Sequence, residues 1–244
     1  NELLDAMPVR LFEVNEGVIF EKGLIRGHGD AALAWQSRRA DDQLQRQVRK
    51  SLARSGWGGE ATEAIEFGAW PDGYTSELGE QAAGWTRTVA ERLRHGVMLL
   101  IDYGFPASEF FHPQRATGTL ACHYRHRVHH DPLWYPGLQD ITAHVDFSAI
   151  AVAAEAAGLS TLGYTSQGNF LLNAGLLDAL SQLPVQQTAE YTRQTQAVHK
   201  LVSESEMGEL FKVLALASQV DDPGPAFSRA NRTGALGLPG VDLG

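Results

Sequence analysis

The ten residues 96–105, GVMLLIDYGF, constrain the fold more than any other stretch of the chain. Five consecutive apolar residues are followed by Asp102, Tyr103 and Gly104. So short an apolar run is typical of a strand that is buried on both faces. In open α/β sheets, ligands bind at the carboxyl ends of such strands. The stretch therefore predicts a core strand with an acid at its ligand-binding edge.

An amphipathic helix is predicted directly before this strand, between Ser76 and His95. Apolar side chains recur there at three- and four-residue spacing, at Leu78, Ala82, Trp85, Val89 and Leu93. Ser76 is a candidate N-cap, and Gly96 suits the left-handed position beyond the helix. A helix followed by a buried strand is half of a wound α/β sheet.

Composition limits the function further. The chain has 244 residues, 43% of them hydrophobic, which is enough for one large domain or a domain with subdomains. Its net charge of −9 disfavours nonspecific binding to nucleic-acid phosphates. The one cysteine, Cys122, excludes an internal disulfide and favours a reducing compartment. With no long apolar run and no signal peptide, we expect a soluble protein of the bacterial cytoplasm or the mitochondrial matrix.

The start of the chain predicts that an N-terminal part is missing. The sequence opens on Asn1-Glu2-Leu3-Leu4-Asp5, without a methionine and without a strand before it. The residues that follow have the pattern expected for the middle of a domain.

The remaining elements are predicted from periodicity and turn residues. They are a β-hairpin around 15–17, an interrupted solvated helix at 30–55, a helix capped by Asp146 and ended by Gly158, a strand at 159–164, a helix at 170–183, and mainly helix at 186–218 with a break near 203–205.

Several patterns of chemical interest give weak signals. The histidines invite a zinc interpretation, but neither a four-ligand structural set nor an HExxH helix is present, so we favour polar loop side chains: His123, His126, His129, His130 and His144. No GxSxG elbow supports nucleophilic hydrolysis. Gly27-His28-Gly29 does not continue into GxGxxG and is better explained as a surface turn.

The acids at turn positions give a stronger signal. Glu2 and Asp5 follow the expected end of a strand, and Asp102 ends the central one. Strand ends of a wound sheet share one edge, so these carboxylates and the 139–146 loop, QDITAHVD, are expected to converge on one cleft. For each acid alone, helix capping or a salt bridge is the more common role.

Six motifs occur in the order found in the MidA-like methyltransferases: NELLDAMPVR, LLIDYGF, GTLACHYRHR, PGLQDITAHVDF, SQGNFLLNAGL and MGELFKVL. The resemblance covers roughly residues 1–228. This family includes a mitochondrial complex I assembly factor that methylates an arginine.

The resemblance implies a class I, Rossmann-like methyltransferase fold: an α/β fold with a mostly parallel seven-stranded sheet. It implies a methyltransferase domain at 1–29 and 76–228, an inserted helical and loop region at 30–75, and an irregular tail at 229–244. The cofactor would be S-adenosyl-L-methionine. Because the family's glycine-rich loop precedes the NELLD motif, residues 1–244 alone are expected to bind it weakly or not at all.

The resemblance also suggests roles for residues, with an arginine-containing protein as substrate. Glu2 and His144 would be catalytic, Glu2 orienting the guanidinium and His144 taking its proton, and Asn1 and Glu2 would contact the cofactor. Substrate-binding positions would be Asn1, Asp5, Asp102, Tyr103, Gln139, Asp140 and Asp146, the last of which is equally well explained as a helix cap. No metal, nucleic acid or membrane is implied. Two alternatives stay open: a non-catalytic assembly factor that holds a protein partner, and methylation of a small molecule.

Overall fold

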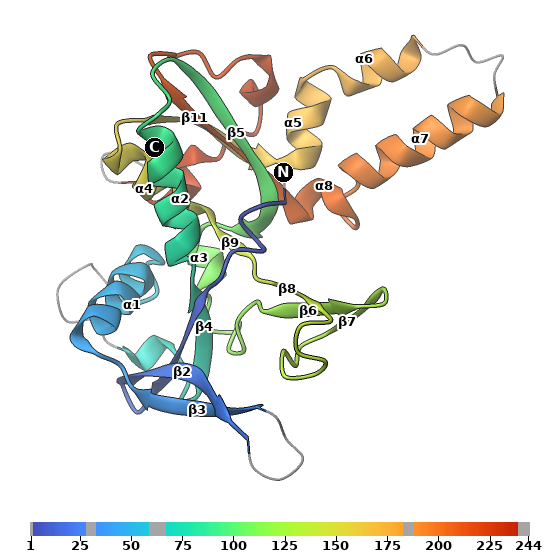
Figure 1. Cartoon of the computed structure of the whole chain (residues 1–244). Coiled ribbons are helices and arrows are strands. Elements are labelled where there is room, and N and C mark those ends of the chain that lie inside the picture. Colours follow the sequence, from blue (N-terminus) through green and yellow to red (C-terminus); the bar gives the residue numbers. More distant parts are fainter. Residues whose placement is uncertain (1, 28–32, 59–66, 183–187, 239–244) are drawn as a thin grey trace. The chain divides into compact units, whose positions relative to one another are not determined.

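The computed structural model describes residues 2–27, 33–58, 67–182 and 188–238, which form two compact units. Unit 1 comprises residues 1–2, 86–104 and 151–244, and unit 2 comprises residues 3–85 and 105–150. Each unit contains strands of a four-stranded sheet (Figure 1).

Unit 2 is built on a four-stranded antiparallel sheet in the order β3-β2-β1-β4. Its strands are β1 (Arg10–Asn15), β2 (Val18–Arg26), β3 (Leu33–Arg39) and β4 (Tyr74–Leu78). The predicted hairpin is confirmed: β1 and β2 pair around Glu16 and Gly17, which both have positive φ, as a tight hairpin turn requires.

Alternation along β1 separates the two faces of this sheet. Phe12 and Val14 are fully buried with Leu44 and Val48 of helix α1 (Asp42–Arg54) in the main core of the unit. The side chain of Asp41 accepts the amide of Leu44 and caps this helix. Leu11, next to the core residue Phe12, belongs to the opposite face, because successive strand residues point to opposite sides.

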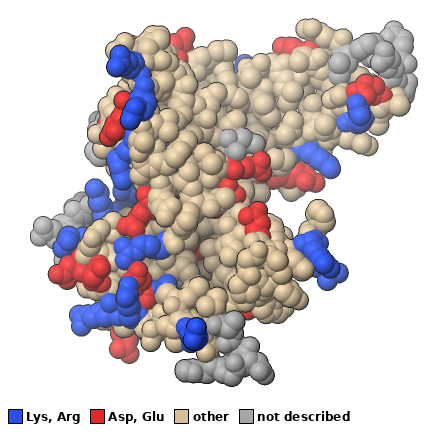
Figure 2. All heavy atoms as spheres, viewed as in Figure 1, with Lys and Arg blue, Asp and Glu red and all other residues tan. Residues whose placement is uncertain are grey.

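The outer surface of this part of unit 2 carries both signs of charge. Figure 2 shows basic and acidic side chains interspersed around α1 and β1–β3. Glu21 pairs with Arg10 at 2.9 Å and with Arg38 at 2.6 Å.

The other elements of unit 2 are short. They are the 3₁₀ turn Phe67–Ala69, α3 (Ala107–Phe110), a three-stranded sheet in the order β7-β6-β8 with β6 (Ala121–Tyr124), β7 (Arg127–His129) and β8 (Asp140–Thr142), and β9 (Val145–Asp146).

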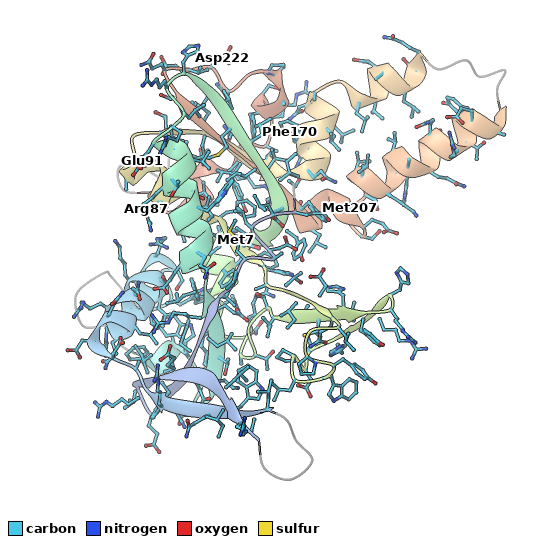
Figure 3. All side chains as sticks on the ribbon, in the orientation of Figure 1. Met7, Arg87, Glu91, Phe170, Met207 and Asp222 are labelled. Carbon is cyan, nitrogen blue, oxygen red and sulfur yellow. The ribbon has the colours of Figure 1, made fainter. Side chains whose placement is uncertain are left out.

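Unit 1 contains the stretch that opened the sequence analysis. Strand β11 (Phe211–Ser218) lies between β5 (Gly96–Phe105) and β10 (Ser160–Ser166) and is antiparallel to both, so β5 and β10 run in the same direction. Val213 and Phe227 form a small core with Phe170, whose ring meets that of Phe227 at 5.3 Å (Figure 3).

Two helices begin in unit 2 and end in unit 1, namely α2 (Glu80–Ala90) and α4 (Phe147–Ala156). The other helices of unit 1 are α5 (Gln167–Asn173), α6 (Leu176–Ser181), α7 (Thr188–Val202) and α8 (Met207–Leu210), followed by the 3₁₀ turns Pro225–Phe227 and Thr233–Leu236.

Several element predictions are wrong. Ser76 does not cap a helix but lies in β4, and α2 begins at Glu80. Residues 33–39 of the expected 30–55 helix form β3, and residues 211–218 of the expected C-terminal helix form β11. The 170–183 helix is divided at Gly175, which has a left-handed conformation.

The predictions for β5 need two corrections. The strand continues through Phe105, and Val97 and Leu99 are 45% and 46% exposed, so its first half is not buried on both faces in this chain. Every strand pair whose register is described is antiparallel, so the described strands do not confirm a mostly parallel sheet. The class I architecture and the predicted domain limits stay predictions.

No helix among the described residues is long and apolar enough to cross a membrane.

The packing of α1 can be tested with a matched pair of leucines in unit 2. Leu44 is fully buried, whereas Leu24 of β2 is 51% exposed. We expect Leu44→Ala to lower the free energy of unfolding by about 2–5 kcal/mol, because it leaves a cavity. Leu24→Ala should cost less than about 1 kcal/mol. Urea unfolding followed by circular dichroism measures both, and equal losses would contradict the assigned core.

Candidate functional site

The predicted site residues divide between the two units. Glu2, Asp102 and Tyr103 belong to unit 1. Unit 2 contains the other described ones, namely Asp5, Gln139, Asp140, His144 and Asp146. Asn1 lies outside the described residues.

In unit 1, the acid of the NELLD motif lies beside the second half of β5. The amide of Glu2 donates a hydrogen bond to the carbonyl oxygen of Ile101 at 3.0 Å, one residue before Asp102. Glu2 is exposed and has a φ of +48°, a conformation that few non-glycine residues adopt. The structure thus brings together two segments whose acids were expected to converge.

The next residues of β5 are more enclosed. Asp102 is only 1% exposed, and its Oδ1 accepts the amide of Tyr103 at 2.9 Å. The ring of Tyr103 meets that of Phe211 edge-on, with 5.5 Å between the ring centres. Asp102 is therefore a buried residue within the strand, whereas Glu2 offers an exposed carboxylate.

In unit 2, the same N-terminal segment contacts the residue before His144. The carbonyl oxygen of Asp5 accepts the amide of Ala143 at 2.9 Å. The amide of His144 donates to Thr119 Oγ1 at 3.0 Å, and its ring centroid lies 5.0 Å from that of Phe105. His144 is therefore positioned by two segments that are distant in sequence.

Asp146 has the cap role that the sequence left open. Its Oδ1 accepts the amide of Ala149 in the first turn of α4 at 3.0 Å, and its Oδ2 lies 3.7 Å from Arg54. Burial raises the pKa of Asp146, and Arg54 and the backbone amides oppose that rise. The helix cap is confirmed; contact with a substrate stays a prediction.

The remaining two loop residues are engaged elsewhere in unit 2. The side-chain amide of Gln139 donates to the carbonyl oxygen of Pro132 at 2.8 Å. Asp140 is exposed on β8, opposite His123 of β6. The contacts described for these two residues do not include Asp5 or His144, and their substrate role stays a prediction.

The sequence did not reveal a buried, hydrogen-bonded acid of unit 2, Glu77. It is 2% exposed in β4. Its Oε1 accepts the amides of Thr119 and Leu120 at 2.8 and 3.0 Å, and its Oε2 accepts the Thr119 hydroxyl at 3.3 Å. Because Thr119 also holds His144, Glu77 anchors the segment on which His144 depends.

Gly118 makes this approach possible. Its φ is +74°, and a Cβ built there would lie 2.2 Å from Glu77 Oε1. The sequence offered one signal, since Gly118-Thr119 opens the GTLACHYRHR motif. Glu77 itself was hidden by the helical spacing of its neighbours.

With this geometry in view, comparison with known proteins defines the class. The family model described as "Putative S-adenosyl-L-methionine-dependent methyltransferase" matches residues 1–165. This is more than half of the chain, so the chain belongs to this family of S-adenosylmethionine-dependent methyltransferases. The MidA-like resemblance is confirmed.

Named relatives extend the assignment. The mitochondrial protein arginine methyltransferase NDUFAF7 of Rattus norvegicus is 33% identical over 124 residues, 50% of this chain and 26% of the relative. Human NDUFAF7 is 32% identical over 142 residues, 57% of this chain and 30% of the relative. A crystal structure from Burkholderia thailandensis with bound S-adenosyl-homocysteine has a TM-score of 0.83 and 42% identity, and the match covers 96% of this chain and 56% of that one. The chain thus spans little more than half of that protein and aligns with less than a third of each curated relative.

The family's cofactor is S-adenosyl-L-methionine, and the crowded glycines of the described residues serve packing within the protein. Among them, the glycines with a neighbour closer than 3.0 Å to a built Cβ are Gly118, Gly163, Gly168 and Gly208. Those neighbours belong to Glu77, Phe227, Val202 and Ser203, so none of these glycines lines an open cradle. Cofactor contact by Glu2 and weak cofactor binding by residues 1–244 both stay predictions.

The histidine-rich region, residues 123–144, is the stretch for which the sequence raised a zinc interpretation. Within the described residues, no group of three or more His, Cys, Asp or Glu side chains is arranged to hold a metal ion. His130 Nδ1 instead lies 3.1 Å from the carbonyl oxygen of Leu120.

The contact of Gly118 with Glu77 can be tested against a glycine of similar backbone. Gly73 has a φ of +80° and nothing within 4 Å of a built Cβ. We expect Gly73→Ala to cost about 1–2 kcal/mol of unfolding free energy from strain alone. Gly118→Ala should cost about 1–3 kcal/mol more, because the new methyl group displaces the carboxylate. Equal costs in chemical denaturation would contradict the contact.

Glu77 should also make stability depend on pH. Burial raises its pKa above the ordinary value of 4.5, and hydrogen bonds from Thr119 and Leu120 oppose this. The folded state then binds more protons than the unfolded state once the pH exceeds 4.5, so unfolding free energy falls as pH rises toward the folded-state pKa. We expect this fall to be shallower in Glu77→Gln than in the wild type.

The measurement is urea unfolding between about pH 4 and pH 8, where this linkage acts. The exposed Glu91→Gln serves as a control for loss of one carboxylate. Parallel curves for wild type and Glu77→Gln would show that Glu77 does not titrate differently on folding.

Proposed function

We propose that this protein is an S-adenosylmethionine-dependent methyltransferase that methylates an arginine side chain of a protein substrate. Family membership supports the methyl transfer, and the names of the rat and human relatives support arginine in a protein as the acceptor. Both relatives are named as mitochondrial, so we expect the matrix in a eukaryote and the cytoplasm in a bacterium.

The observation that carries the proposal is the bond from the Glu2 amide to the Ile101 carbonyl oxygen. It holds the backbone of the exposed acid of the NELLD motif beside Ile101, in the second half of β5. Its positive φ alone does not mark a functional residue, because Glu16 in the β1–β2 turn has the same φ of +48°. The position beside the second half of β5 distinguishes Glu2, since ligands of α/β sheets bind toward the carboxyl ends of strands.

An exposed carboxylate suits the chemistry of a guanidinium. With a pKa of about 12.5–13.8, the guanidinium stays charged, and its nitrogens are poor nucleophiles. A carboxylate that accepts two of its N–H groups fixes the plane of the fork and draws the positive charge toward itself. The remaining nitrogen is then better placed to attack, which is the role we assign to Glu2.

The proton released on methylation needs an acceptor, and we assign this to His144. Imidazole titrates near neutral pH, so it can accept a proton and return it to water. The bond from its amide to Thr119 and the bond from the adjacent Ala143 to Asp5 hold its backbone. Asp5, which is buried, supports this segment.

The test compares two exposed glutamates with the same backbone conformation in the full-length protein. We expect Glu2→Gln to lower the rate of transfer of labelled methyl groups to proteins of a cell lysate by about 100-fold or more, the scale of losing a key electrostatic contact. Glu16→Gln should leave the rate unchanged. Amino-acid analysis of the labelled protein identifies the methylated residue.

An unchanged rate in Glu2→Gln would contradict the role of Glu2. Label on a residue other than arginine would contradict the acceptor. If the wild-type protein transfers no label but retains a protein partner, the chain acts as a binding factor and the catalytic proposal is wrong.

A further inference from the structure

Unit 2 contains a cavity of about 550 Å³. Its floor is the sheet face opposite α1, formed by Leu11, Lys22, Trp35, Thr75 and Glu77. These residues come from all four strands, and Leu11 is the register partner of both Lys22 and Glu77. The volume lies within the range of about 300–1,000 Å³ that is typical of small-molecule sites.

Two cations line this cavity, and both lie over aromatic rings. Lys22 Nζ lies 5.5 Å from the ring centre of Trp35, and the guanidinium of Arg115 lies 4.3 Å from that of Phe105. Within the described part of the chain, neither side chain forms an ion pair. Arg115 Nε donates to the carbonyl oxygen of Glu109 at 3.3 Å, but this acceptor is neutral, so no carboxylate within ion-pair distance offsets either charge in the described structure.

The one acid in the lining, Glu77, does not neutralise both cations, because a single carboxylate faces two positive charges. Its oxygens also accept hydrogen bonds from Thr119 and Leu120, and its side chain is almost fully buried. His130 and His144, which also line the cavity, add no negative charge. The polar part of the cavity thus favours an anion.

The apolar part of the lining favours a hydrophobic or aromatic body on the same ligand. Leu11 and Trp35 lie in the floor, and Leu120 and Pro132 also line the cavity. An aromatic group gains from burial and from stacking on an indole ring.

We propose that this cavity binds a carboxylate that is attached to an apolar or aromatic group, with Lys22 and Arg115 attracting the carboxylate and Leu11 and Trp35 contacting the body. The site does not depend on methyl transfer. The carboxylate could belong to a free acid or to an acidic side chain of a peptide, and the ligands below distinguish these sources.

The test is a titration of the 244-residue chain, followed by the indole N–H resonance of Trp35 in nuclear magnetic resonance spectra. Trp35→Phe assigns that resonance among those of the five tryptophans. The ligands are N-acetyl-phenylalanine, its neutral amide, and the blocked dipeptide N-acetyl-Phe-Glu-amide. We expect at least one of the two acids to shift the resonance and bind about tenfold or more tightly than the amide, the scale of a hydrogen bond to a charged group. The tighter of the two acids identifies the source.

Variants locate the charge. Lys22→Met and Arg115→Met keep an extended apolar chain, and each should weaken the preferred acid about tenfold while leaving the amide unchanged. Lys50→Met, on the exposed side of α1, should have no effect. Equal affinity for acids and amide, tighter binding of N-acetyl-argininamide, or no shift of the Trp35 resonance would each overturn the proposal. These three overturning results are all measured on the wild-type chain, so they do not depend on how the Lys22 and Arg115 variants fold.

Discussion

The rest of unit 2 depends on one buried carboxylate. Burying the carboxylate of Glu77 costs free energy unless its oxygens accept hydrogen bonds. They accept them from the amides of Thr119 and Leu120 and from the hydroxyl of Thr119. This contact joins β4 to a segment some 42 residues later in the chain. It also requires glycine at position 118, where any larger side chain would collide with the carboxylate. Because Thr119 in turn accepts the amide of His144, the sheet, the cavity wall and a candidate catalytic residue share one anchor.

Backbone hydrogen bonds hold both candidate catalytic residues. Glu2 is fixed by its amide and His144 by its own amide and that of its neighbour. Side chains placed in this way can be changed without removing the bonds that position them, which is useful for chemistry and for mutagenesis alike. In contrast, the side chains of Asp102 and Asp146 are buried and their carboxylates accept backbone amides. Of the acids that the sequence grouped together, Glu2 is therefore the exposed one in unit 1.

Local signals predicted the elements that depend on local chemistry. The β1–β2 hairpin follows from its turn residues, β5 from its apolar run, and α4 from Asp146 at its cap. β11 was assigned to a helix because Leu and Ala favour helices, but pairing with both β5 and β10 buries nearly all of it and overrides that preference. β4 shared its apolar spacing with α2 by coincidence. Glu77 could not be predicted, because nothing near it in the sequence marks partners that the fold brings from residues 119 and 120. The family was predictable, since six ordered motifs identify it without any knowledge of these contacts.

The most direct test of this account is amide hydrogen exchange in the wild type and in Glu77→Leu. This substitution removes the hydrogen-bond acceptor and replaces it with an apolar side chain of similar size. The amides of Thr119, Leu120 and His144 should lose protection together, by about tenfold or more, because an unpaired buried amide costs about 1–3 kcal/mol. The amide of Ala40, which bonds Ile19 in the same unit, provides the reference for any general loss of stability. If the three amides keep their protection relative to Ala40, Glu77 is not the anchor of this segment.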